Sequence, residues 1–264
     1  MTGAQPGEAS DAYVAFLDRQ GAVFREERHA GYARLDLQPG NAVLDAGCGP
    51  GVDTFDLEEL VGREGRVVGV DASETMIAVA RKRASQRDSH AEFLVGDVRT
   101  LELQSETFDL VRAVLLLLHV EDPDAAVREM VRVLRPGGRI VCIDVDHQMD
   151  AVDATDLALA ERVFRGRFAD LPSPRIGRQL RGLFAGAGLA QVEVEVLPKV
   201  STSWDQFNEL EGDGRPTVFE LAARRGDATK SELESLEADL RTRDAEGRFF
   251  ACAARMRCSG VKRS

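Results

Sequence analysis

The stretch Val43–Gly51 (VLDAGCGPG) carries Gly47, Gly49 and Gly51 directly after an apolar run. Glycine has no Cβ, so it adopts positive φ and lets a ligand approach the backbone closely. The G-x-G-x-G spacing is shorter than the G-x-G-x-x-G of dinucleotide-binding loops, where a pyrophosphate rests on the following helix. The stretch therefore predicts a loop that contacts a ligand without a pyrophosphate, with an ordinary tight turn as the alternative.

Acidic residues stand near the ends of neighbouring predicted strands. Asp45 lies two residues before the first glycine of the loop. Asp71 ends the next apolar run, twenty residues after Gly51, and Asp97 ends the run that follows. The carboxyl ends of parallel strands meet at one edge of a sheet, where a carboxylate can bind both hydroxyls of a ribose. Taken singly, each acid could instead be a helix cap or a turn residue.

These residues need a framework that brings strand ends together, and apolar runs that alternate with helical patterns provide it. Strands buried on both faces read as continuous apolar runs, and strands separated by helices form right-handed βαβ units. The pattern therefore predicts an α/β fold with a doubly wound parallel sheet. The expected strands are 42–46, 66–71, 91–97, 108–117 and 139–146, and the expected helices are 55–62, 73–85 and 122–138.

The rest of the chain departs from this alternation. Helical patterns at 152–168 and 176–187 indicate an insertion, and strands are expected at 190–197 and 248–257 with helices between them. Thr229 and Glu232 predict a capping box for the last helix. We expect one domain, composed of an N-terminal helical lid (1–38), a cofactor-binding core (39–147), a helical cap (148–188) and C-terminal strands and helices (189–264).

Composition narrows the function classes. The 264 residues carry a formal net charge of −11, which disfavours nucleic acid as a partner and favours a small-molecule substrate. The four cysteines are scattered without a CxxC pair, so we expect reduced thiols in a cytoplasmic protein. The apolar run Ala113–Leu118 is far too short to span a bilayer, so no membrane partner is expected.

Together these segments resemble class I S-adenosylmethionine-dependent methyltransferases. The resemblance covers roughly residues 35–196 and rests on VLDAGCGPG, GVDASETMIAVAR, FLVGDV, FDLVRAVLLLLHV and RVLRPGG. It implies that S-adenosylmethionine is the cofactor and S-adenosylhomocysteine the product. It further implies that the cofactor contacts the glycine loop, the ribose-binding acid and nearby positions: Asp45, Gly47, Gly49, Gly51, Asp71, Ala72, Met76, Asp97, Val98 and Ala113.

The resemblance also implies a Rossmann-like sheet of seven strands in the order 3-2-1-4-5-7-6, with strand 7 antiparallel. The segment Ser173–Leu189 is similar to cap segments of bacterial methyltransferases that modify small molecules in secondary metabolism. The implied function is methyl transfer to an O, N or C atom of a small molecule, by a monomer or homodimer. A non-methylation reaction on the same fold, such as a cyclisation, and a non-catalytic cofactor sensor are the alternatives.

A general base is needed only for some acceptors, because a sulfonium methyl group is already activated. His119 follows the strand at 108–117 and is the first candidate base, with Asp144 and His147 beyond the next strand as second choices. A histidine that only shapes the pocket is the alternative for position 119. Asp144, Asp146 and His147 also resemble a ligand set, but such residues on one short loop are typical of solvated turns, so we predict no metal.

Overall fold

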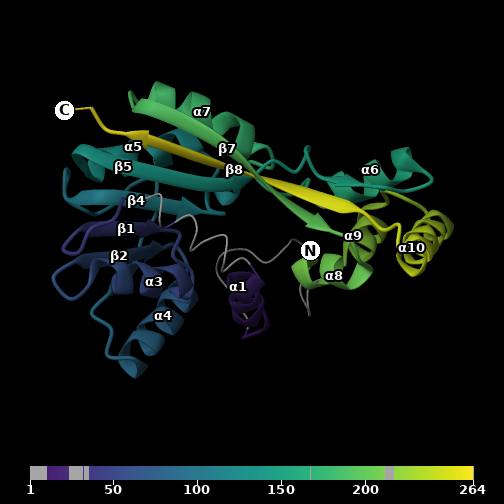
Figure 1. Cartoon of the computed structure of the whole chain (residues 1–264), viewed down its shortest axis with the longest axis horizontal. Coiled ribbons are helices and arrows are strands. Elements are labelled where there is room, and N and C mark those ends of the chain that lie inside the picture. Colours follow the sequence, from purple (N-terminus) through teal and green to yellow (C-terminus); the bar gives the residue numbers. More distant parts are fainter. Residues whose placement is uncertain (1–10, 24–31, 33–35, 167, 212–216, 264) are drawn as a thin grey trace.

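A twisted sheet forms the centre of the molecule (Figure 1). The computed structural model describes residues 11–23, 32, 36–166, 168–211 and 217–263. Neighbouring strands follow the order β3-β2-β1-β4-β5, so β1 lies in the middle and all five of its residues are buried. The five strands are parallel: β1 (Ala42–Ala46), β2 (Arg66–Asp71), β3 (Glu92–Val95), β4 (Phe108–Val114) and β5 (Leu134–Val145).

Antiparallel strands complete the sheet. β7 (Ala190–Ser201) and β8 (Ala251–Val261) form a long ribbon, and β8 runs antiparallel to β5. These two strands are the sixth and seventh predicted from the sequence, so the predicted order 3-2-1-4-5-7-6 is confirmed. A two-residue strand that was not predicted, β6 (Ala151–Val152), pairs with Ala251 and Cys252 of β8.

Helices cover both faces of the sheet. α3 (Val52–Val61) and α4 (Glu74–Gln86) pack on one face, whereas α5 (Pro123–Val133) and α7 (Ile176–Gly186) pack on the other. Alternate residues of β1 point into the two resulting cores, as successive side chains of a strand must. The predicted doubly wound arrangement is confirmed.

The N-terminal helix α1 (Asp11–Val23) lies beside α3 and α4. Its Asp18 carboxylate forms an ion pair with Arg83 of α4 at 2.7 Å, and its Phe16 side chain is buried. The predicted helical lid, 1–38, includes 1–10, 24–31 and 33–35, which lie outside the described residues. The described part of that segment is therefore α1 together with residues 32 and 36–38.

The two helices within the expected cap, 148–188, pack in different hydrophobic cores. The apolar side chains of α7, including Leu180 and Phe184, are fully buried against the sheet as part of the main core. α6 (Leu157–Gly166) packs instead with helices from the C-terminal part of the chain. An amphipathic pattern shows that a helix has an apolar face but not which surface will cover it.

A second core lies at the far end of the β7–β8 ribbon (Figure 1). It is built by α6 together with α8 (Trp204–Glu211), α9 (Val218–Arg225) and α10 (Lys230–Ala245). The predicted capping box of Thr229 and Glu232 is present at the start of α10. Among the described residues, no helix combines the length and the apolar composition needed to cross a membrane.

Aromatic side chains fill this second core. The Trp204 ring centroid lies 5.9 Å from those of Phe207 and Phe249. Phe164 of α6 meets Phe207 edge to face at 5.6 Å. Such ring pairs contribute about 0.5–1.5 kcal/mol each beyond the area they bury. The aromatic residues in this part of the chain therefore hold the helices together.

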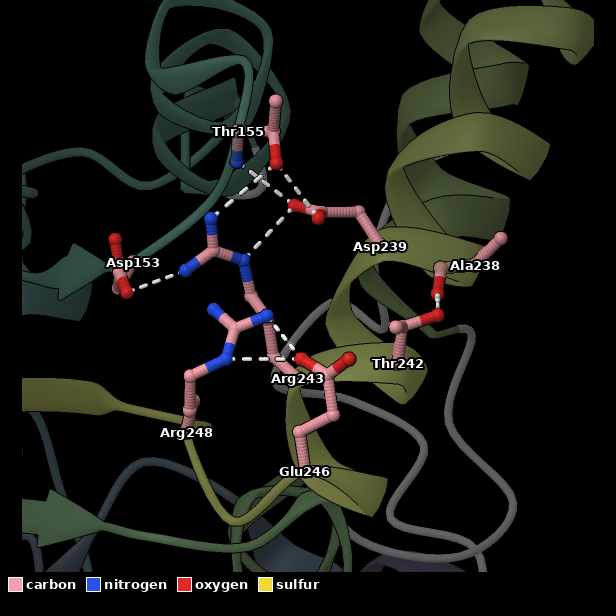
Figure 2. A network of polar contacts seen from close by, with 8 residues as sticks. All are labelled: Asp153, Thr155, Ala238, Asp239, Thr242, Arg243, Glu246 and Arg248. Carbon is pink, nitrogen blue, oxygen red and sulfur yellow. Dashed lines mark hydrogen bonds and ion pairs between the residues drawn. The ribbon is translucent and has the colours of Figure 1, made fainter.

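Figure 2 shows a polar network that joins α10 to the segment before α6. Arg243 donates to Asp239 at 3.1 Å and to the Thr155 hydroxyl at 3.3 Å, and it also pairs with Asp153. Asp239 accepts the Thr155 N–H at 2.8 Å and the Thr155 hydroxyl at 2.7 Å. Burial raises the pKa of Asp239, but the hydrogen bonds from Thr155 and Arg243 outweigh it and lower that pKa. The network thus fixes α10 against the start of α6.

Replacing Arg243 with methionine should lower the free energy of unfolding by about 1.5–3 kcal/mol, the range for hydrogen bonds to charged groups. The reason is that the Arg243 side chain is only 11% exposed and its carboxylate partners would lose their counter-charge. The matched control is Arg248→Met, because Arg248 pairs with Glu246 on the surface (Figure 2) and should cost at most about 1 kcal/mol. Urea denaturation that gave equal losses for both variants would contradict this role.

Candidate functional site

The glycine loop has the backbone geometry that its sequence predicts. Gly47, Gly49 and Gly51 all have positive φ, at 73°, 53° and 84°. The Gly47 N–H donates to the Val70 carbonyl of β2 at 2.7 Å. A Cβ on Gly47 would lie 2.8 Å from the Leu116 side chain, so a larger residue does not fit there. The loop is therefore held closely between the ends of β2 and β4.

Asp71 ties the glycine loop to the next helix. Its Oδ2 accepts the Gly49 N–H at 2.9 Å, and its Oδ1 accepts the Ser73 N–H at 2.8 Å. Ser73 in turn caps α4 by accepting the Met76 N–H at 3.3 Å. Burial raises the pKa of Asp71, while these backbone hydrogen bonds oppose the rise. Because each carboxylate oxygen has a second lone pair, Asp71 can still accept two hydrogen bonds from a ligand.

The other residues predicted to contact the cofactor differ in their solvent exposure. Ala72 is exposed directly after Asp71, and Met76 is buried in the first turn of α4. Val98 and Ala113 pack into the main core.

Asp97 lies at the same edge of the sheet, but a neighbour occupies its carboxylate. The Arg99 guanidinium binds both oxygens at 2.7–3.1 Å, and the Arg99 N–H adds a hydrogen bond at 2.8 Å. Hydrogen bonding to Arg99 lowers the pKa of Asp97.

The Asp45 carboxylate, which the sequence places before the glycine loop, faces the protein interior. It is 2% exposed and accepts the Thr54 hydroxyl at 2.7 Å and the Arg112 Nη1 at 3.2 Å. Arg112 also donates from Nη2 to Asp53 at 2.7 Å. The Tyr32 hydroxyl donates to the other Asp53 oxygen at 2.8 Å. Asp45 thus belongs to a buried network in the protein interior, next to the start of the glycine loop, that stabilises this loop.

This buried network joins four parts of the chain: β1, α3, β4 and residue 32. Burial raises the pKa of Asp45 against the attraction of Arg112. Burial also lowers the pKa of Arg112, but Asp53 and Asp45 outweigh it and raise that pKa. Sequence reasoning missed Arg112 and Asp53, although a lone arginine within the apolar run FDLVRAVLLLL was a usable signal. A charge in a buried strand requires a buried partner.

Asp144, a second-choice base from the sequence, is held by backbone N–H groups. It is 1% exposed, and its carboxylate accepts the N–H groups of Leu117 (2.8 Å), Leu118 (3.3 Å) and Val145 (3.0 Å). Burial raises the pKa of Asp144 to about 7. These contacts cap the short 3-10 helix η1 (Leu117–His119) after β4. Asp144 is therefore placed to position that turn.

His119 is exposed at the end of η1, and the loop before α7 runs beside this turn. Ser173 donates its N–H to the Leu118 carbonyl at 3.1 Å and its hydroxyl to the Val120 carbonyl at 3.2 Å. The next residue, Pro174, accepts the His147 N–H at 3.1 Å. One short loop thus connects the two histidines that follow β4 and β5.

His147 has the geometry of an oriented base. Its Nδ1 lies 2.8 Å from an Asp150 oxygen, and its ring is parallel to that of Phe168 with the centroids 3.2 Å apart. A carboxylate at Nδ1 fixes the ring and leaves Nε2 to exchange a proton. The other Asp150 oxygen accepts the Ala254 N–H at 3.2 Å, so β8 orients the pair. Sequence reasoning named His147 but missed Asp150, which follows three residues later.

Two cavities are prominent in the described part of the chain. The larger, about 1210 Å³, runs along α3 and α4 and is lined by charged residues of those helices. The smaller, about 270 Å³, lies beyond β5 and is lined by His147 and Phe168 among others. Only the smaller one touches a predicted site residue. Among the described residues, no group of three or more His, Cys, Asp or Glu side chains could hold a metal ion.

The sequence of this chain is similar to those of known proteins. The profile of the methyltransferase domain family matches residues 37–170, half of the chain. An uncharacterized 37.1 kDa protein in transposon TN4556 of Streptomyces fradiae is 40% identical over 191 residues, which are 72% of this chain and 55% of that protein. Demethylmenaquinone methyltransferase of Lactococcus lactis is 40% identical over 115 residues, 43% of this chain and 46% of that enzyme. The chain thus spans about half the length of these curated relatives.

The fold also matches solved structures. Phosphoethanolamine N-methyltransferase 2 of Haemonchus contortus, in complex with S-adenosyl-L-methionine, superimposes with a TM-score of 0.58 at 19% identity. The match covers 90% of this chain and 53% of that one. The family match extends from before β1 to beyond α6 and so includes the glycine loop, Asp71 and the ends of the parallel strands. The chain belongs to the methyltransferase domain family and has the class I, S-adenosylmethionine-dependent fold.

Proposed function

We propose that this chain transfers the methyl group of S-adenosylmethionine to a small-molecule acceptor. The observation that carries the proposal is the Asp71 bridge, in which one carboxylate holds Gly49 and Ser73 and keeps acceptor capacity for two hydroxyl groups. This is the recognition that a ribose requires. The positive φ of the glycines lets a cofactor lie against the loop backbone, with Ala72 and Met76 beside its base.

The cofactor supplies an activated methyl group when it is bound, and the chain's own residues orient the partners. Holding two reactants in line converts a bimolecular step into a unimolecular one and lowers the barrier by about 7–11 kcal/mol. The fixed glycine loop, the capped α4 and the η1 turn each limit movement at the binding edge. Orientation is therefore the main contribution of this protein to the reaction.

His147 is the base that takes the acceptor proton. Its support is the Asp150 contact at Nδ1 and its place in the wall of the cavity beyond β5. With Nδ1 held by a carboxylate, Nε2 is the nitrogen that accepts the proton, and the carboxylate stabilises the imidazolium that results. His119 lies at the neighbouring edge position, on the turn capped by Asp144.

The named relatives act on small molecules, a demethylmenaquinone and a phosphoethanolamine, which supports an acceptor of this size. A place in secondary metabolism is a further part of the proposal. Radiolabelled methyl transfer into a panel of small phenols, sugars and amines tests whether methyl transfer occurs and which class of small molecule accepts the methyl group. Label in any of them would support methyl transfer, whereas cofactor binding without any transfer would favour the cyclisation or sensor alternatives.

Replacing Asp71 with alanine should weaken S-adenosylhomocysteine binding by about 1.5–3 kcal/mol, because hydrogen bonds to a charged group are lost. Isothermal titration calorimetry measures this change directly. Asp88→Ala is the control, since Asp88 is 94% exposed and pairs only loosely with Arg63 at 3.5 Å. Unchanged affinity in the Asp71 variant would remove the ribose assignment.

A further inference from the structure

The cavity beyond β5 has a wall made by two stretches of the chain, residues 147–148 and residues 165–175. His147 comes from the loop after β5, Phe168 follows α6, and Pro174 and Arg175 precede α7. The Pro174 carbonyl fixes the His147 backbone at 3.1 Å, so the loops on both sides are connected. The cavity lies at the carboxyl end of a parallel strand, the edge at which α/β sheets bind ligands.

The charges that line this cavity are positive. Arg165 and Arg175 both contribute to the wall, and none of the described residues in it is acidic. Arg165 pairs at 3.5 Å with Glu161, a contact in which both side chains are about half exposed. Arg175 forms no ion pair with any described residue, and it stands at the N-terminus of α7, where the helix dipole adds positive potential.

Two ring side chains, His147 and Phe168, also line the cavity and stack on each other with an interplanar angle of 4°. Such a surface receives a planar or apolar group, while the guanidinium groups bind carboxylate or phosphate oxygens through their forked N–H donors. The volume of about 270 Å³ suits a small acceptor and not a polymer.

We infer that this cavity is the acceptor site and that Arg165 and Arg175 bind an anionic group, a carboxylate or a phosphate, on the acceptor. The inference rests on the proposed methyl transfer, because it assigns the acceptor to the same edge of the sheet. The anion lies against the two arginines, and the rest of the acceptor lies on the His147–Phe168 stack. The nitrogen of His147 that is not bound to Asp150 then faces the acceptor.

Calorimetric titration of the full chain, saturated with S-adenosylhomocysteine, tests the site with phenyl phosphate and benzoate as anionic probes and phenol as the neutral probe. We expect at least one of the anions to bind ten-fold or more tightly than phenol. Arg165→Ala and Arg175→Ala should each weaken that binding ten-fold or more, and Arg175→Lys should restore part of it. Arg128→Ala is the matched control, because Arg128 also pairs with an acid four residues away on a helix but lies outside the cavity.

The outcomes separate this inference from the proposed function. Anions that bind no better than phenol, or binding that both alanine variants leave unchanged, would overturn the anionic site. The wild type could also fail to bind S-adenosylhomocysteine and still bind phenyl phosphate through Arg165 and Arg175. That result would contradict the proposed methyl transfer and support the anion site. Because both arginines lie at the surface and circular dichroism reports folding, a misfolded variant is recognised before titration.

Discussion

Replacement of His147 by asparagine is expected to lower turnover by about 10²-fold or more, the usual contribution of general-base catalysis. Asparagine keeps a hydrogen-bonding group next to Asp150 but has no basic nitrogen, so the affinity for the cofactor should be nearly unchanged. The KM for the acceptor should rise, because the variant loses one of the two rings on which the acceptor lies, but the fall in kcat is the signature of the lost base.

Two further histidine variants make this test specific. His90→Asn is the control, because His90 pairs with Glu58 on the surface of α3 and should have no effect. His119→Asn tests the histidine that the sequence favoured as the base. If turnover fell in His119→Asn and stayed near normal in His147→Asn, the base would be His119. Asp150→Asn should give an intermediate loss, since the ring would keep its basic nitrogen but lose its orienting charge.

Replacement of Arg112 by methionine is expected to lower the free energy of unfolding by about 3–5 kcal/mol, the range for breaking a buried ion pair from one side. Arg112 is 3% exposed, and its loss leaves Asp45 buried without its counter-charge. Chemical denaturation measures the loss. S-adenosylhomocysteine binding should weaken as well, because Asp45 lies directly before the glycine loop.

Two controls separate the buried charge from the loss of arginine packing. Arg99→Met removes an arginine from a pair with Asp97 in which both side chains are 40% exposed, so solvent screens the pair and its loss should cost far less than that of Arg112. The double variant Arg112→Met with Asp45→Asn removes the uncompensated carboxylate and should recover part of the stability. Equal losses in Arg112→Met and Arg99→Met would show that burial adds nothing to this ion pair.

Much of the fold could be predicted because the formation of each strand and helix depends mainly on residues that are close together in the sequence. β1 and β2 begin and end at the predicted residues, since a strand buried on both faces is recognised by a nearly continuous apolar run. β4 is shorter than predicted: its apolar run continues into a turn where Leu115 has φ of 51° and Asp144 caps the backbone. The sequence is apolar both in β4 and in the turn that follows, so the apolar pattern could not mark where β4 ends.

The sequence by itself determined the alternating framework, the positive-φ glycine loop and the position of Asp71, because these depend on residues close together in the chain. Only the tertiary structure decided that Asp45 faces Arg112, that α7 covers the sheet, and that His147 meets Asp150 and Phe168. A charge in an apolar run, or the apolar face of a helix, indicates that the residue must contact a partner. The identity of that partner depends on how distant segments pack together, and a local sequence pattern does not contain this information.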